Sequence, residues 1–242
     1  MEFEFKEKYS MSDLLKIIEI LRSPEGCPWD RVQTHKSIRS NFIEEVYEAI
    51  EAIDLEDSEN LKEELGDVLL QIVFHCSLEK QNGSFDFNDV VDAICKKLLV
   101  RHPHVFSDVK AKNSKQALEV WDEMKRKTNK ETPKESIERI SKFLPELMRT
   151  QKIQNKAAKE GYGIFSVEEA IIETFDRLHY LSTVIMKGIQ GEYDDAVGDL
   201  LFSVAEIGRL IDVDAENALY NSSKRFTEKF YEKLTLEKQS DI

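Results

Sequence analysis

At 242 residues with 41% hydrophobic side chains, the chain is long enough to bury a sizeable core and to form one large or two small domains. Its formal net charge of −13 disfavours nucleic acid or an anionic membrane as a partner, whereas a polyanionic small substrate stays possible if a divalent cation covers the local acids. Only 9 glycines and 5 prolines indicate long helices with few turns.

The cysteines and the first residues narrow the class of protein further. Cys27, Cys76 and Cys95 have no paired spacing, so neither a zinc site nor a disulfide is predicted. The start of the chain does not have the pattern of a signal peptide, and no apolar run reaches the length of a membrane-spanning helix. We therefore expect a soluble, reduced, cytoplasmic protein.

The first predicted helix has Ser12 as its N-cap and ends near Leu21, before a turn at residues 24–28 that is rich in proline and glycine. In the loop that follows, Trp29 can either fill a gap in the core or offer a flat apolar surface to a nucleobase. The local sequence favours the core position.

Two helices that carry paired acids come next, joined by a short polar connection at residues 54–58 in which Ser58 is the predicted N-cap. The second of them is expected to end near Gly83. A connection this short makes the helices antiparallel neighbours, so acids on facing sides meet. Each helix has two acids at i,i+3 spacing, which places both on one side of that helix: Glu45 with Glu48, and Glu64 with Asp67.

These acids lie at the edges of apolar stripes, with Gly66 permitting close approach of the helices, whereas Glu44 points further away. Buried carboxylates need a cation or protons, and oxygen ligands alone suit Mg²⁺ or Mn²⁺. The lack of an associated Glu-x-x-His argues against a di-iron site. A solvated acidic face is the alternative, and spacing leaves both open. The stripes are Ile38, Phe42, Val46, Ala49 and Ile53 in the first helix, and Leu61, Leu65, Val68, Leu69, Ile72 and Cys76 in the second.

Two further helices carry cations and a tryptophan. Asp86 or Asn88 begins a helix that ends at residues 102–103, and Lys97 and Arg101 share one of its faces at i,i+4 spacing. As an alternative, these cations only complement the helix dipole. A helix from about Ser114 then carries Trp121 and Lys125, which in isolation are most simply a packing residue and a surface charge.

The second half of the chain contains an internal repeat after a polar stretch at residues 125–133 that indicates a linker. Residues 197–201 echo residues 65–69 at an offset of 132 positions. Of the four acids only Asp199 is retained, since the others become Arg177, Tyr180 and Ala196. We expect this copy to keep the fold without the metal ligands, with a helical core formed by Phe175, Leu178, Leu181, Val197, Leu200, Leu201, Val204 and Ile211. The expected domains are 1–127 and 144–242, with a linker at 128–143.

Several motifs occur in a specific order: Gly-Cys-Pro-Trp-Asp and Gln-Thr-His within residues 26–35, then the paired acids, then Arg-His-Pro-His-Val-Phe at 101–106. Together with residues 144–154, they resemble the MazG family of nucleoside triphosphate pyrophosphohydrolases over nearly the whole chain. The resemblance implies an all-α fold of tandem MazG-like helical bundles, four-helix-type and homodimer-forming. It implies Mg²⁺-dependent hydrolysis of nucleoside triphosphates to the monophosphate and pyrophosphate.

The family's functional residues can be carried over to matching positions. The metal ligands fall on Glu45, Glu48, Glu64 and Asp67, and Glu44 completes the catalytic motif. The substrate contacts fall on Lys97, Arg101, Trp121 and Lys125, with Trp29 as a candidate nucleobase surface. In some family members the C-terminal copy carries the activity; here its substitutions assign the activity to the N-terminal copy.

Two alternatives remain beside this function. One is a narrower pyrophosphatase that prefers dUTP or dCTP. The other is a helical interaction or regulatory protein without turnover, which the altered second copy keeps open. Nucleic acid and membrane are not expected as partners.

Overall fold

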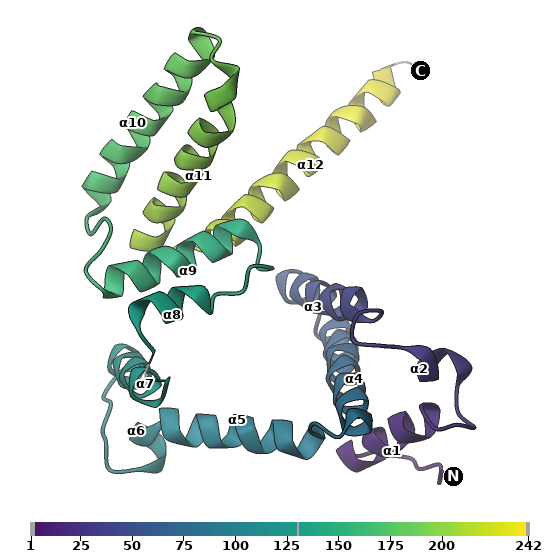
Figure 1. The fold of residues 1–242 in the computed structure, drawn as a ribbon. Coiled ribbons are helices and arrows are strands. Elements are labelled where there is room, and N and C mark those ends of the chain that lie inside the picture. The colour runs from purple at the N-terminus through teal and green to yellow at the C-terminus, as the bar shows by residue number, and fades with distance from the viewer. Residues whose placement is uncertain (1–2, 130, 241–242) are drawn as a thin grey trace. The chain divides into compact units, whose positions relative to one another are not determined.

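The computed structural model describes residues 3–129 and 131–240, which form α-helices, one 3-10 helix and connecting loops (Figure 1). The described residues contain no strand, so the all-α class expected from the sequence is confirmed. The chain divides into two compact units, Met1–Lys125 and Arg126–Ile242. Within the described residues, none of the helices combines the length and the apolar character needed to cross a lipid bilayer.

Unit 1 is built around an antiparallel pair of helices, α3 and α4, with α1 packed against α4 (Figure 1). Helix α5 follows α4 after a short turn, and α7 begins in this unit and continues past its boundary. The helices are α1 (Met11–Leu21), α2 (Pro28–Val32), α3 (Arg39–Asp54), α4 (Ser58–Asn82), α5 (Phe87–Arg101), α6 (Pro103–Phe106) and α7 (Ser114–Asn129).

Local capping explains where these helices begin. At α1 the cap is Ser10 rather than Ser12, because the Asp13 carboxylate accepts hydrogen bonds from the Ser10 backbone N–H (2.8 Å) and hydroxyl (2.7 Å). At α4 it is Asp57 rather than Ser58, since its side chain accepts the Asn60 N–H at 3.1 Å. Each of these two predicted caps was therefore wrong by one or two positions.

The other predicted boundaries of the acidic hairpin and of α5 agree with the structure. Gly83 follows α4 with a φ of 73°, the left-handed conformation that glycine adopts without strain. Asp86 caps α5 through the N–H groups of Asn88 (2.7 Å) and Asp89 (3.2 Å). Because Gly83 ends one helix and Asp86 begins the next, α5 can turn away from the axis of α4.

The core of unit 1 lies where α1 crosses the C-terminal half of α4 (Figure 1). Burying each such side chain stabilises a fold by about 1.5–3 kcal/mol. Partly buried residues of α1, α4 and the first turn of α5 pack around this cluster. The buried members are Ile18, Ile38, Val73, Phe74 and Leu78.

The N-terminal half of the hairpin is much more open than the sequence predicted. Val46, Ile53 and Leu65 were assigned to buried stripes, yet all three are exposed in the single chain. Burial of α3 is confined to small side chains, Ala49 and Ala52. A Cβ added at Gly66 would meet nothing within 4 Å, so the expectation of a close helix approach there was wrong. Helix α5 likewise exposes apolar residues at Val91, Ile94, Leu98, Leu99 and Val100.

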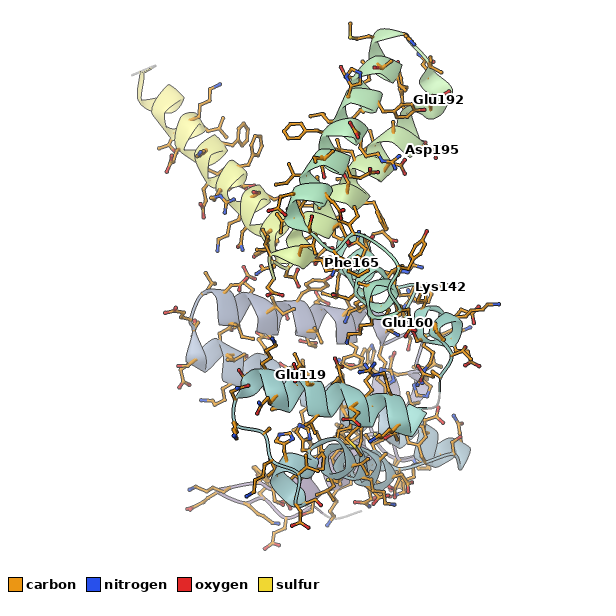
Figure 2. All side chains as sticks on the ribbon, turned by 90° about the vertical axis from the view of Figure 1, so that its left-hand side faces the viewer. Glu119, Lys142, Glu160, Phe165, Glu192 and Asp195 are labelled. Atoms are coloured by element: carbon orange, nitrogen blue, oxygen red, sulfur yellow. The ribbon has the colours of Figure 1, made fainter. Side chains whose placement is uncertain are left out.

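Unit 2 also contains an antiparallel hairpin, α10 with α11, and α9 packs against α11 (Figure 1). Figure 2 shows Glu192 and Asp195 near the tip of this hairpin and Phe165 at its base. Helix α8 lies inside the stretch 128–143 that the sequence marked as a linker, and it packs on α9. The elements are α8 (Pro133–Glu138), α9 (Glu146–Lys159), α10 (Val167–Met186), η1 (Gln190–Glu192), α11 (Tyr193–Leu210) and α12 (Ala215–Ser240).

The two hairpins keep the register of the sequence repeat at the turn. Helix α10 ends at Met186, which is 132 positions after Asp54 at the end of α3. The next element begins at Gln190, which is 132 positions after Ser58 at the start of α4. The repeat therefore corresponds to a repeated structural element and not only to similar residues.

The interior of unit 2 differs from the predicted apolar core. Phe175, Leu178, Val197, Leu201, Val204 and Ile211 are exposed, so their assignment to a core of this chain was wrong. The buried apolar residues are Ala170, Val184, Ala196 and Ala205 in the hairpin, together with Ile140.

Polar side chains complete this interior. The buried Gln151 donates to the carbonyls of Ala205 (3.2 Å) and Val213 (2.9 Å) and accepts from the Ala215 N–H at 3.0 Å. One α9 side chain thereby joins α11 to the start of α12.

Candidate active site

Three carboxylates meet on the facing sides of α3 and α4. One oxygen from each of Glu45, Glu48 and Glu64 lies within 4.8 Å of the other two. The short loop between the helices makes them antiparallel, and i,i+3 spacing on α3 keeps Glu45 and Glu48 on the same side. The sequence prediction that acids from the two helices would face each other is correct for these three residues.

The environment of the cluster disfavours full ionisation. Glu45 and Glu64 are half-buried, whereas Glu48 is exposed. Loss of hydration raises the pKa of Glu45, and the charges of Asp67, Glu48 and Glu64 raise it further. Loss of hydration also raises the pKa of Glu64, followed by the charges of Glu48 and Asp67. A nearby cation would relieve this repulsion.

The donor set fits a hard divalent cation. Carboxylate oxygens are the ligands that Mg²⁺ and Mn²⁺ prefer, and the cluster contains no nitrogen or sulfur donor. Asp67 is outside the group of three, although its charge acts on both Glu45 and Glu64. Glu44 is exposed and also outside the group, as its direction on the helix predicted.

A second group forms at the end of α5 and on α7. The guanidinium carbon of Arg101 lies 5.2 Å from the centre of the Trp121 ring, and the Lys125 ammonium lies 5.1 Å from it. Lys97 is exposed one turn before Arg101. Figure 1 shows α5 leaving the C-terminal end of α4, and α7 does not pack closely on α3 or α4 among the described residues. Within one chain the cationic group and the carboxylate cluster are therefore two separate groups.

Trp29 lies on the short helix α2 with 60% of its surface exposed. Its interpretation as a core residue is therefore wrong for this chain. Gln33 donates to the Trp29 carbonyl at 2.9 Å and holds the end of this helix. An exposed indole remains available as a flat apolar surface.

A histidine pair that joins the loop before α3 to α4 was not foreseen from the sequence. The Nδ1 atoms of His35 and His75 are 2.7 Å apart, and the rings stack with their planes 1° apart. His35 Nε2 lies 2.6 Å from a Glu79 carboxylate oxygen. Burial lowers the pKa of His75, and the charge of His35 lowers it further. Helical spacing along α4 gives no sign that His75 has a partner in the loop before α3.

A family model of the "MazG nucleotide pyrophosphohydrolase domain" matches residues 33–106, which include all three clustered carboxylates. A "Nucleoside triphosphate pyrophosphohydrolase/pyrophosphatase MazG" from Thermotoga maritima is 38% identical over 90% of this chain and 83% of its own length. A "Nucleoside triphosphate pyrophosphohydrolase" from Escherichia coli K12 is 38% identical over 90% of this chain and 85% of its own length.

The site thus places the chain among all-α proteins with a carboxylate cluster on a helical hairpin. The chain belongs to the MazG family, as the resemblance in its motifs implied. Among solved structures, a MazG-related protein from Thermotoga maritima aligns with a TM-score of 0.42 and 28% identity, over 48% of this chain and 99% of that one.

Proposed function

We propose that this chain hydrolyses nucleoside triphosphates to the monophosphate and pyrophosphate, with Mg²⁺ as cofactor and the active site on α3 and α4. The observation that carries the proposal is the meeting of Glu45, Glu48 and Glu64 inside the segment that the family model matches. The proposed activity is the one stated in the names of the relatives from Thermotoga maritima and Escherichia coli.

Glu45, Glu48, Glu64 and Asp67 would hold the metal. When bound, Mg²⁺ supplies positive charge to the triphosphate oxygens and lowers the pKa of a water molecule. Fit to this cation is supported by the oxygen-only donor set and by the raised pKa of Glu45 and Glu64. Mn²⁺, which favours similar ligands, is the expected substitute.

The remaining chemistry belongs to the chain's own side chains. Water attacks the α-phosphorus, the bond from this phosphorus to the bridging oxygen breaks, and pyrophosphate leaves with that oxygen. Glu48 is the best-placed proton acceptor for the water because it is the exposed member of the cluster. Glu44 is the second candidate for this role, since it completes the motif on the same helix.

The charge on the leaving pyrophosphate would be covered by Lys97, Arg101 and Lys125, with Trp121 and Trp29 as aromatic surfaces for the substrate. Within one chain, the group formed by Arg101, Trp121 and Lys125 is separate from the carboxylate cluster. We therefore infer a homodimer in which each copy completes the site of the other. Exposed apolar residues of α3, α4 and α5 support this assembly, since monomers rarely expose so many.

The proposed division of labour follows the sequence repeat. Residues 1–127 form the catalytic MazG-like bundle, 128–143 connect it, and 144–242 form a second bundle of the same four-helix type without the metal ligands. In this second bundle, Arg177 takes the place of Glu45 and pairs with Asp199 at 2.9 Å.

Pyrophosphate release from a panel of nucleoside triphosphates, including dUTP and dCTP, tests this proposal directly. We expect Mg²⁺-dependent release that is lost on chelation. Release from only one or two deoxynucleotides would instead identify a narrower pyrophosphatase. A folded chain that releases no pyrophosphate from any member of the panel, in Mg²⁺ or Mn²⁺, would contradict the proposal.

A further inference from the structure

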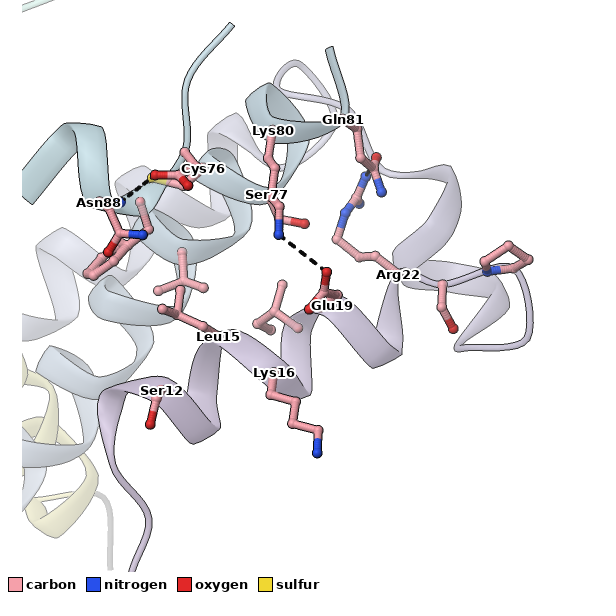
Figure 3. A pocket seen from close by; sticks show the side chains of 16 residues that line it. Ser12, Leu15, Lys16, Glu19, Arg22, Cys76, Ser77, Lys80, Gln81 and Asn88 are labelled. Carbon is pink, nitrogen blue, oxygen red and sulfur yellow. Dashed lines mark hydrogen bonds and ion pairs between the residues drawn. The ribbon is translucent and has the colours of Figure 1, made fainter. Parts of the chain in front are cut away.

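A cavity of about 670 Å³ lies between α1, the C-terminal half of α4 and the start of α5 (Figure 3). Its walls are apolar at Leu15, Ile18, Val73 and Phe87. Two cations also reach it, Arg22 just after α1 and Lys80 on α4, whereas the Lys16 ammonium points away from the cavity and lies 6.0 Å from the centre of the Phe3 ring. This combination of apolar walls and a few charged groups is typical of small-molecule sites.

The cavity is distinct from the carboxylate cluster although both use α4. At 100° per residue, Glu64, Asp67 and His75 share one side of this helix. Val73, Ser77 and Lys80, which line the cavity, lie on the opposite side. The cavity is also nearer the C-terminal end of the helix, so a ligand there would not touch the carboxylates.

Arg22 is a buried cation at this cavity, and its hydrogen-bond donors are not all satisfied. Its surface is only 6% exposed, and its guanidinium lies 4.7 Å from the centre of the Phe74 ring. One terminal nitrogen donates to the Asp30 carbonyl at 2.6 Å and the other to Gln81 Oε1 at 2.7 Å. The Nε–H group is buried without a hydrogen-bond partner. Both partners that it does have are neutral.

The guanidinium charge is not balanced by an ion pair. Among the carboxylates whose side chains the structure describes, none forms an ion pair with Arg22. Burial lowers the pKa of Arg22, and the charge of Asp30 opposes this shift without direct contact. A buried charge without a counter-charge is costly. The carboxylates that line the cavity are engaged elsewhere: Glu19 pairs with Lys80 at 3.3 Å, and Asp86 caps α5.

We propose that this cavity binds a small organic anion, with a phosphate or carboxylate group directed to Arg22 and an apolar or aromatic body against the cavity walls. Lys80 lies in the same cavity, where it pairs with Glu19. The anion supplies the ion-pair partner that the buried guanidinium does not have. Because Arg22 also holds the Asp30 carbonyl of α2, the occupied cavity stabilises the segment that leads to α3.

The test uses the full chain in EDTA, so that divalent cations do not draw anions to the carboxylates. Phenyl phosphate, 3-phenylpropionate, uncharged 3-phenylpropanol and inorganic phosphate are titrated by calorimetry. We expect one site per chain for the two aromatic anions, with the alcohol and inorganic phosphate at least about 10-fold weaker. The tighter of the two anions identifies the physiological group as phosphate or carboxylate.

Matched variants locate the binding. Arg22→Gln is expected to weaken the binding of both anions by at least about 10-fold, and Lys80→Glu by a few-fold, because it places a second carboxylate beside Glu19 in the cavity. Lys62→Gln is the control, because Lys62 is exposed on α4 outside the cavity and pairs with Glu59 at 2.5 Å. If Arg22→Gln does not fold, the Lys80→Glu variant and the comparison of charged with uncharged probes still test the proposal.

Three results would overturn the proposal. One is the absence of binding by either aromatic anion at concentrations up to about 10 mM. Another is equal affinity for 3-phenylpropanol and 3-phenylpropionate, because the charge would then contribute nothing. The third is wild-type affinity in both cavity variants.

Discussion

The two helical hairpins of this chain differ in how the negative charge of their carboxylates is balanced. In α3 and α4, Glu45, Glu48 and Glu64 meet, and no Lys or Arg of the described residues forms an ion pair with them. In α10 and α11, Arg177 replaces Glu45 and binds two carboxylates, Glu173 at 2.5 Å and Asp199 at 2.9 Å.

At two further positions, the second hairpin has uncharged side chains where the first hairpin has acids. Tyr180, which replaces Glu48, donates its hydroxyl to Glu192 at 2.5 Å. Ala196, which replaces Glu64, is fully buried. A hairpin of this kind can therefore balance its charge with its own guanidinium. In the first hairpin, none of the ion pairs among the described residues reaches Glu45, Glu48 or Glu64, and the proposed Mg²⁺ would supply the positive charge there.

The largest effect is expected from removing a charge at the first hairpin. Glu64→Gln should reduce pyrophosphate release by about 100-fold or more, since even outer-shell changes at metal sites cost about 10–100-fold. Circular dichroism should show unchanged helicity. The paired control is Asp199→Asn in the second hairpin, which should leave turnover within a few-fold of wild type. Equal damage from both substitutions would mean that the second hairpin takes part in the chemistry.

A smaller loss is expected from the cations of α5. Lys97→Ala or Arg101→Ala should lower kcat/KM by about 10–150-fold, because a hydrogen bond to a charged group contributes about 1.5–3 kcal/mol. Lys96→Ala is the matched control, as Lys96 is adjacent in sequence but pairs with Asp92 at 2.6 Å. Stabilisation by Mg²⁺ should persist in all three variants. Loss of this stabilisation in Lys97→Ala or Arg101→Ala would mean that these cations support the metal site.

Thermal unfolding separates the two ways of balancing charge. Mg²⁺ at 100 times its Kd should stabilise the wild type by about 2.7 kcal/mol, and Glu45→Gln should weaken this effect. Arg177→Gln should destabilise unit 2 by at most about 1 kcal/mol, because its ion pairs are exposed to solvent. The metal response should be unchanged in this variant. Full rescue of Arg177→Gln by Mg²⁺ would show that the second hairpin also binds the cation.

The smallest effect concerns His75, whose counterpart 132 positions later is Ile207. Since the pKa of His75 is lowered in the folded state, the unfolded chain binds more protons as pH falls below the ordinary value of 6.5. The free energy of unfolding should therefore decrease as pH falls through this window, and His75→Gln should reduce the slope. Denaturant unfolding between pH 7.5 and about 5 measures it. An unchanged slope in His75→Gln would contradict this assignment.

Helical periodicity predicted the parts of this molecule that depend on local spacing. It placed Glu45, Glu48 and Glu64 on facing sides of two neighbouring helices, and their meeting follows from 3.6 residues per turn and a short loop. It also predicted the end of α4 at Gly83, because only the backbone conformation at one residue is involved.

Periodicity was less successful where the outcome depends on contacts distant in sequence. Apolar stripes at Val46, Leu65 and Phe175 indicate which faces need a partner, but not whether the partner belongs to the same chain. The pairing of His35 with His75 spans 40 positions, and no local pattern contains it. The register of the repeat was visible in the sequence. The ion pairs of Arg177 with Glu173 and Asp199 could be identified only from the distances in the structure.

The side chain of Gln151 has a mechanical consequence for unit 2. Its carboxamide joins backbone groups on both sides of the turn between α11 and α12. The orientation of the long α12 therefore depends in part on one planar group, together with its packing on α9 and the hydrogen bond that Glu216 accepts from the Met148 N–H. A rotation of a few degrees there becomes a displacement of several ångströms at the far end, since a helix extends by about 1.5 Å per residue. Small changes in the packing of α9 would thus be amplified along α12.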